Sequence, residues 1–66
     1  MIRIYKYVNN IALNGREYLL DGDNQVRIFS SANKAIEALA DAGIKSNNED
    51  ELNSDYDIFL ERITYP

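Results

Sequence analysis

The chain contains no cysteine and no histidine. Without cysteine it can form no disulfide, no thiolate zinc site and no thiol nucleophile. Without histidine it lacks the commonest general base and the commonest transition-metal ligand. These two absences remove the side chains on which most enzymes and metalloproteins depend. We therefore expect a protein that is not an enzyme and that holds no metal or cofactor.

Long apolar runs are also missing from the sequence. No segment approaches the ~20 consecutive apolar residues that a membrane-spanning helix needs, and the first residues, MIRIYKYV, lack the pattern of a signal peptide. What the chain does have is a globular composition, with 45% hydrophobic and 27% charged residues in a length of 66. We expect a single small domain over residues 1–66, soluble and cytoplasmic, with no membrane partner.

Motifs that would bind phosphate or calcium are incomplete. The three glycines are scattered and form no phosphate-binding loop. Residues 21–25 resemble the start of a calcium-binding loop, which requires Gly at its sixth position and Glu at its twelfth. Val26 and Ala32 occupy those positions, so the segment is better interpreted as a turn in which Asp and Asn bond to their own backbone.

Two pairs of aspartates could in principle serve acid–base chemistry. Asp21 with Asp23, and Asp55 with Asp57, are each two residues apart and would point to one side of an extended segment. A domain of this length leaves little room for a substrate cleft of ~300 Å³ or more. Turn formation and solvation explain these carboxylates more simply than catalysis.

Alternating apolar residues predict β-strands in the first half of the chain. Residues 2–8 form one candidate strand, in which Lys6 marks an edge or the end of the covered area. A short apolar piece near Ile11 could add another, and Asn14-Gly15 is a strong hairpin signal. A second hairpin is expected from strands at 16–20 and 25–29 around a turn at 21–24. Its core-facing residues would be Tyr18, Leu20, Val26 and Ile28.

A helix is expected over residues 32–42, with a serine cap at its start and Gly43 after its end. Ser46 and Glu49 then have the spacing of a capping box, so residues 47–53 could form a helical turn or an acidic loop. The last strand is expected from Tyr56 to Tyr65. The predicted order is β-β-β-α-β. It indicates an α+β fold with a mostly antiparallel sheet of three to four strands and one helix on one face.

A single helix can cover only one face of such a sheet. The residues expected on the other face are largely aromatic, and aromatic side chains favour protein interfaces. We predict that this aromatic face contacts a partner or a second copy of the chain. Its residues are Tyr5, Tyr7, Phe59, Ile63 and Tyr65.

Charge is distributed unevenly along the chain. Residues 1–36 carry five basic and three acidic residues, whereas residues 37–66 carry two basic and eight acidic ones, within a formal net charge of −4. No basic residue lies between the first and last of six acids, which we predict to form a partner-binding acidic face. These acids are Glu49, Asp50, Glu51, Asp55, Asp57 and Glu61. The acidity disfavours direct nucleic-acid binding.

Two hypotheses for the function follow. In the first, the chain is an acidic module that binds a basic protein surface, such as a nucleic-acid groove, with its carboxylates imitating phosphates. In size, acidity and hairpin-then-helix layout it resembles many small phage- and prophage-encoded proteins, including inhibitors of bacterial defence systems. In the second, the aromatic face forms a homodimer or accessory subunit, and the acids only confer solubility.

Overall fold

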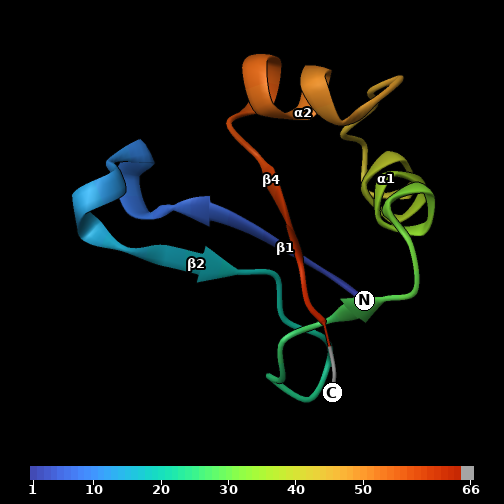
Figure 1. Cartoon of the computed structure of the whole chain (residues 1–66), viewed down its shortest axis with the longest axis horizontal. Coiled ribbons are helices and arrows are strands. Elements are labelled where there is room, and N and C mark those ends of the chain that lie inside the picture. The colour runs from blue at the N-terminus through green and yellow to red at the C-terminus, as the bar shows by residue number, and fades with distance from the viewer. Residues whose placement is uncertain (65–66) are drawn as a thin grey trace.

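The fold combines an antiparallel four-stranded sheet with two helices, in a computed structural model that describes residues 1–64 (Figure 1). The elements are β1 (Ile2–Tyr7), β2 (Arg16–Tyr18), β3 (Ile28–Phe29), α1 (Ala32–Asp41), α2 (Glu49–Tyr56) and β4 (Phe59–Arg62). The predicted α+β class and antiparallel sheet are confirmed. The expectation of one helix is corrected to two, because the acidic segment after α1 is helical.

Strand β1 is the centre of the sheet and pairs antiparallel with all three other strands. Along one edge it pairs with β4, where Arg3 lies opposite Glu61. Along the other edge, its second half pairs with β2 and its first half with β3, where Ile2 lies opposite Phe29. Among residues 1–64, the first and last strands are therefore neighbours.

The predicted hairpin between residues 16–20 and 25–29 is wrong in most of its length. Only Leu20 and Val26 pair, and the segment between them closes through a bond from the Asp21 amide to the Gln25 carbonyl over 2.8 Å. Strand β3 then continues along β1 and buries Phe29, while Ile28 and Leu20 are each 47% exposed. β3 pairs with β1 instead of with β2 because this pairing places Phe29 in the core beside Ile2.

The connection between β1 and β2, residues 8–15, is a structured loop at one end of the sheet (Figure 1). It forms 3₁₀ turns at Val8–Asn10 and Ala12–Asn14, where sequence suggested a further strand near Ile11. Gly15 has φ +85°, a left-handed backbone that glycine adopts readily. The hairpin signal at Asn14-Gly15 is thus confirmed, with a longer connection than a two-residue turn.

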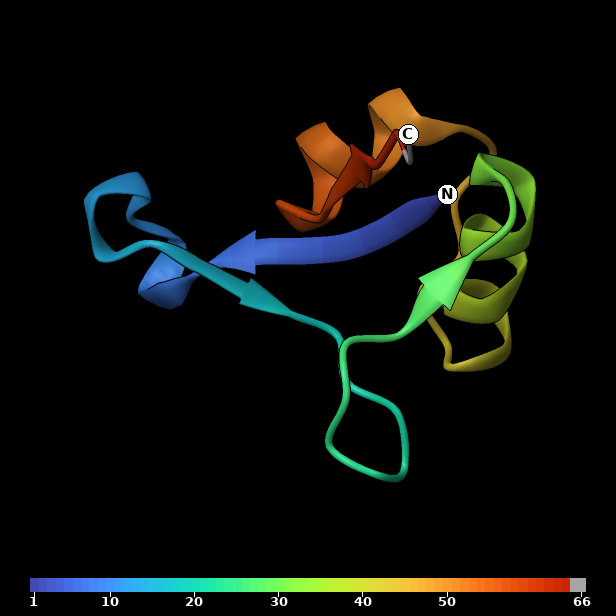
Figure 2. The same cartoon turned by 60° about the horizontal axis from the view of Figure 1, so that its bottom comes forward.

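Both helices pack on the same face of the sheet (Figure 2). Ile2 and Ile4 of β1 and Leu60 of β4 are buried beneath Leu39 of α1 and Leu52 of α2. Alternation along β1 leaves Arg3, Tyr5 and Tyr7 on the opposite face, as the sequence predicts. That opposite face carries no helix in the described part of the chain and is called the open face below.

Helix α1 begins at the predicted residue and ends at Asp41, one residue before the predicted end. Ser31 is its N-cap, and its hydroxyl oxygen accepts a bond from the Lys34 amide. After the helix, Gly43 has φ +96°, and the Ile44 amide bonds back to the Leu39 carbonyl over 2.9 Å. The caps fix the length of α1, so Ile44 can pack against the core.

Helix α2 decides the alternative that the sequence left open. Its N-cap is Asn48, whose side chain accepts from the Glu51 amide, and Ser46 plays no capping role. The helix extends to Tyr56, which is 42% exposed instead of forming the start of the last strand. Asp57 then ends it with φ +55°. Within residues 1–64, no helix is long and apolar enough to cross a membrane.

Candidate functional site

Helix α2 carries most of the acids that the sequence grouped together. Glu49, Asp50 and Glu51 occupy its first turn, where carboxylates interact favourably with the helix dipole. Asp55 lies in its last turn and Asp57 at its C-cap. The only buried residue of the helix is Leu52, which holds it against the core. The segment therefore presents its charged side to solvent from a fixed position.

Glu49 is the one α2 acid that is neutralised by a cation. Its two carboxylate oxygens accept hydrogen bonds from the Arg62 guanidinium of β4, over 2.6 and 3.1 Å. These bonds lower the pKa of Glu49 below its ordinary value. The ion pair ties the start of α2 to β4 and removes Glu49 from the charge available to a partner.

The remaining four acids of the segment form what we call the α2 acidic surface: Asp50, Glu51, Asp55 and Asp57. Asp50, Asp55 and Asp57 are exposed, while Glu51 is half-buried because its carboxylate accepts from the Asn47 amide over 2.7 Å. None of the four forms an ion pair with any residue between 1 and 64. Their negative charge is therefore uncompensated.

Glu61 lies apart from this surface, on the open face of the sheet. Arg3 of β1 donates to Oε1 from two guanidinium nitrogens, and Arg16 and Tyr18 of β2 donate to Oε2. The bonds from Tyr18 and Arg3 lower the pKa of Glu61. Two arginines thus surround one carboxylate, so Glu61 contributes an anchor for the sheet instead of a negative charge for a partner.

An aromatic cluster lies beside this network. Tyr5 is at its centre, with ring centroids 5.7 Å from Tyr7, 5.8 Å from Tyr18 and 5.5 Å from Phe59. Burial in this cluster raises the pKa of the Tyr5 hydroxyl. The cluster joins Tyr5, Tyr7 and Phe59 of the predicted aromatic face and adds Tyr18. Ile63 follows β4 and is half-buried, and Tyr65 lies outside the described residues.

The two arginines of the network also cover aromatic rings. The Arg16 guanidinium carbon lies 4.3 Å from the centre of the Tyr5 ring, and that of Arg3 lies 4.7 Å from the Tyr18 ring. Sequence reasoning did not assign Arg3 or Arg16 to this face, although Arg3 and Tyr5 are two residues apart on one strand and share a face. It expected Tyr18 to face the core, which is wrong, because Tyr18 lies opposite Tyr5 on β2 and bonds to Glu61. Because guanidinium groups shield the rings, the open face offers less apolar area than the sequence alone suggested.

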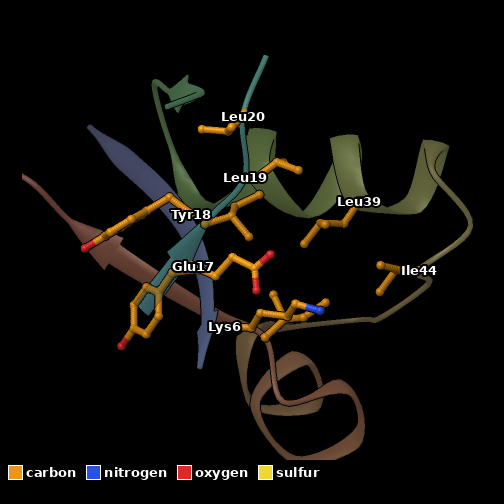
Figure 3. A pocket seen from close by; sticks show the side chains of 10 residues that line it. Lys6, Glu17, Tyr18, Leu19, Leu20, Leu39 and Ile44 are labelled. Atoms are coloured by element: carbon orange, nitrogen blue, oxygen red, sulfur yellow. The ribbon is translucent and has the colours of Figure 1, made fainter. Parts of the chain in front are cut away.

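An apolar pocket of about 370 Å³ opens on the helix-bearing face (Figure 3). Its walls include Ile4, Leu39, Ile44 and Ile58 from the core side and Leu19 and Leu20 after β2. Lys6 and Glu17, which pair across β1 and β2, extend toward Leu39 and Ile44. The pocket marks the corner of this face where the helices do not cover β2, and sequence reasoning did not predict it.

The other candidate sites from the sequence have structural roles. The Asp21 side chain accepts bonds from the Asp23 and Gln25 amides over 2.8 and 3.2 Å, which confirms the turn interpretation. In residues 1–64 no group of three or more acidic side chains is arranged to hold a metal ion.

Comparison with known proteins gives no assignment. The chain matches no protein-family model, no curated protein and no solved structure. Inferences about its function therefore rest on its own surfaces.

Proposed function

We propose that this chain is a non-enzymatic acidic module that binds a protein partner through the α2 acidic surface. The observation that supports the proposal is the difference among its six predicted acids. Glu49 and Glu61 are paired with arginines, whereas the four acids of the α2 acidic surface have no cation partner between residues 1 and 64. A surface of uncompensated charge attracts a partner of opposite charge and speeds their encounter.

The spacing of these carboxylates suits a partner surface that otherwise binds nucleic acid. Glu51 and Asp55 are four residues apart and therefore project from one side of α2, about 6 Å apart along its axis. Two nucleotide steps along one DNA strand advance about 7 Å along the duplex axis. Lysines and arginines placed for phosphates could therefore meet carboxylates at a similar interval.

Occupation of such a surface would inhibit the partner, because α2 and a nucleic acid could not contact the same lysines and arginines together. We assign this mode of action to the chain: a small inhibitor, of the phage or prophage type, that blocks a host or defence protein. The contact does not require chemistry at a catalytic centre. Charge positions the partner, and neighbouring apolar contacts hold it.

The test compares two triple variants that both change the formal net charge from −4 to +1. The first changes three of the four acids of the α2 acidic surface, by Asp50→Lys, Asp55→Lys and Asp57→Asn. It keeps Glu51, which orders the start of the helix. The matched control changes exposed acids elsewhere by Glu37→Lys, Asp41→Lys and Asp23→Asn. Each tagged protein is used to capture partners from host lysate at low and high salt.

The proposal expects one stoichiometric partner that is retained by the wild type and the control and lost by the α2 variant. Binding should weaken at high salt, because screening shortens the range of the attraction. A DNA duplex should compete with the chain for the captured partner. Equal capture by the α2 variant and the wild type would refute the role of this surface. Failure of DNA to compete would refute the nucleic-acid groove as the target.

A further inference from the structure

The loop at residues 8–15 presents apolar side chains to solvent from a hydrogen-bonded backbone. Leu13 is 97% exposed and Ile11 is 51% exposed. Backbone bonds from the Ile11 amide to Val8 and from the Asn14 amide to Ile11, over 3.1 and 3.0 Å, hold the turns. The Asn14 side chain also donates to the Val8 carbonyl over 3.2 Å. Because the loop is already ordered, burying Leu13 against a partner would cost little further entropy.

The apolar pocket lies on the same β1–β2 hairpin as this loop. Lys6 and Glu17 stand at the pocket two residues from where the strands enter and leave the loop region. Leu19 and Leu20, which line it, are 37% and 47% exposed. The volume of about 370 Å³ is ample for the side chain of a leucine. One chain thus carries an exposed apolar side chain in its β1–β2 loop and an open apolar pocket lined by residues of the same two strands.

Lys6 and Glu17 supply the charge pattern that identifies the occupant. They lie side by side across β1 and β2 with opposite charges, and neither forms an ion pair in the part of the chain that the structure describes. A two-fold axis beside them would place Lys6 of one copy against Glu17 of the other, twice. Such a surface is self-complementary, as the symmetric contact of a homodimer requires.

We propose that this surface joins two copies of the chain in a symmetric dimer. Leu13 of each copy enters the apolar pocket of the other, and reciprocal Lys6–Glu17 ion pairs flank the two-fold axis. The contact buries Leu19 and Leu20 along with the loop. It does not use the α2 acidic surface, so it is independent of the function proposed above.

The experiment measures the mass of the purified protein by sedimentation equilibrium from micromolar to millimolar concentration. The wild type should form a reversible dimer. Leu13→Ser should raise the dissociation constant about tenfold or more, the effect of losing a central apolar contact. Because Leu13 is 97% exposed in the single chain, this change leaves the fold intact. Ile28→Ser is the matched control, since Ile28 is 47% exposed and does not line the pocket.

The charge pair gives a second test that does not depend on Leu13. Lys6→Glu alone and Glu17→Lys alone should each weaken the dimer, because like charges then meet across the axis. The double variant Lys6→Glu/Glu17→Lys should restore it, because the reciprocal pairs form again with their signs exchanged. A wild type that stays monomeric at millimolar concentration would overturn the proposal. So would a dimer that survives Leu13→Ser or is not rescued by the double exchange.

Discussion

The Tyr18 hydroxyl donates a hydrogen bond to Glu61 Oε2 over 2.7 Å. Tyr18 belongs to β2 and Glu61 to β4, and these strands flank β1 on opposite edges. Tyr18 lies opposite Tyr5 and Glu61 opposite Arg3, so the bond crosses the central strand and connects the two outer strands on the open face. It makes Glu61 a structural residue, although its sequence position places it after a run of acids.

Glu61 should make stability depend on pH in the acid range. Its pKa in the fold lies below its ordinary value of 4.5 because Tyr18 and Arg3 donate to it. The stabilisation is therefore complete at neutral pH and is lost as the pH falls from about 4.5 through the lowered pKa. Glu61→Gln should lower the free energy of unfolding at pH 7. Urea denaturation at several pH values should show the difference from the wild type shrinking toward pH 3. A difference that does not change with pH would contradict this assignment.

Leu52 should be the residue on which the position of α2 depends. It is fully buried and is the only buried residue of that helix. Leu52→Ala should reduce the free energy of unfolding by about 2–4 kcal/mol, because it removes core contacts and leaves a cavity. Thermal or urea denaturation measures the loss. Ile28→Ala, at a position that is 47% exposed and outside the pocket, is the control and should cost less stability; a similar loss in both variants would show that Leu52 has no special role.

The start of α2 should depend on Asn48 and not on Ser46. Asn48→Ala removes the side-chain acceptor of the Glu51 amide and should cost about 1 kcal/mol. Ser46→Ala should be neutral or slightly stabilising, because the Ser46 hydroxyl is buried with no hydrogen-bond partner among residues 1–64. Hydrogen exchange of the α2 amides would compare the two variants. Greater loss of protection in the Ser46 variant would reverse the assignment of the cap.

Gly43 should be needed for its backbone conformation. Gly43 follows the end of α1 and has φ +96°, and the space around it is open. An alanine methyl group would therefore clash with nothing, but the backbone conformation would be strained. Gly43→Ala should destabilise the fold by about 1 kcal/mol. Gly22→Ala is the matched control, because Gly22 also has open space but no positive φ. Equal stability of the two variants in urea denaturation would show that the conformation of Gly43 carries no cost for alanine.

Local signals in the sequence were sufficient for α1 and for the faces of β1. Ser31 and Gly43 act on neighbouring backbone groups, and alternation separates Ile4 from Tyr5 without reference to other elements. The second hairpin failed for the opposite reason. Its turn formed at Asp21, but the partner of β3 was decided by burial of Phe29 beside Ile2, a contact between segments far apart in the chain.

The candidate sites also differ in whether neighbouring residues or distant contacts determine them. The α2 acidic surface could be predicted because its acids are neighbours in sequence on one short helix. The pairing of Glu49 and Glu61 with arginines could not be predicted, because it depends on the position of Arg62 and on the register of β4 against β1. The pocket could not be predicted from the sequence either, because it forms where α1, β2 and Ile58 meet in the fold.

The central place of β1 has a consequence for how the chain acquires its structure. Residues 2–7 are synthesised well before residues 59–62, yet one edge of β1 from Ile2 to Tyr5 pairs only with those later residues. Until then Ile2 and Ile4 lack Leu60 and the α2 residue Leu52 as neighbours. Pairing of β1 with β4 joins residues at opposite ends of the described chain, and contacts between residues so far apart in sequence slow folding. Strand β1 therefore has an unpaired edge from its synthesis until β4 is made, and such an edge can pair with other chains. Rapid docking of β4 would shorten that exposure.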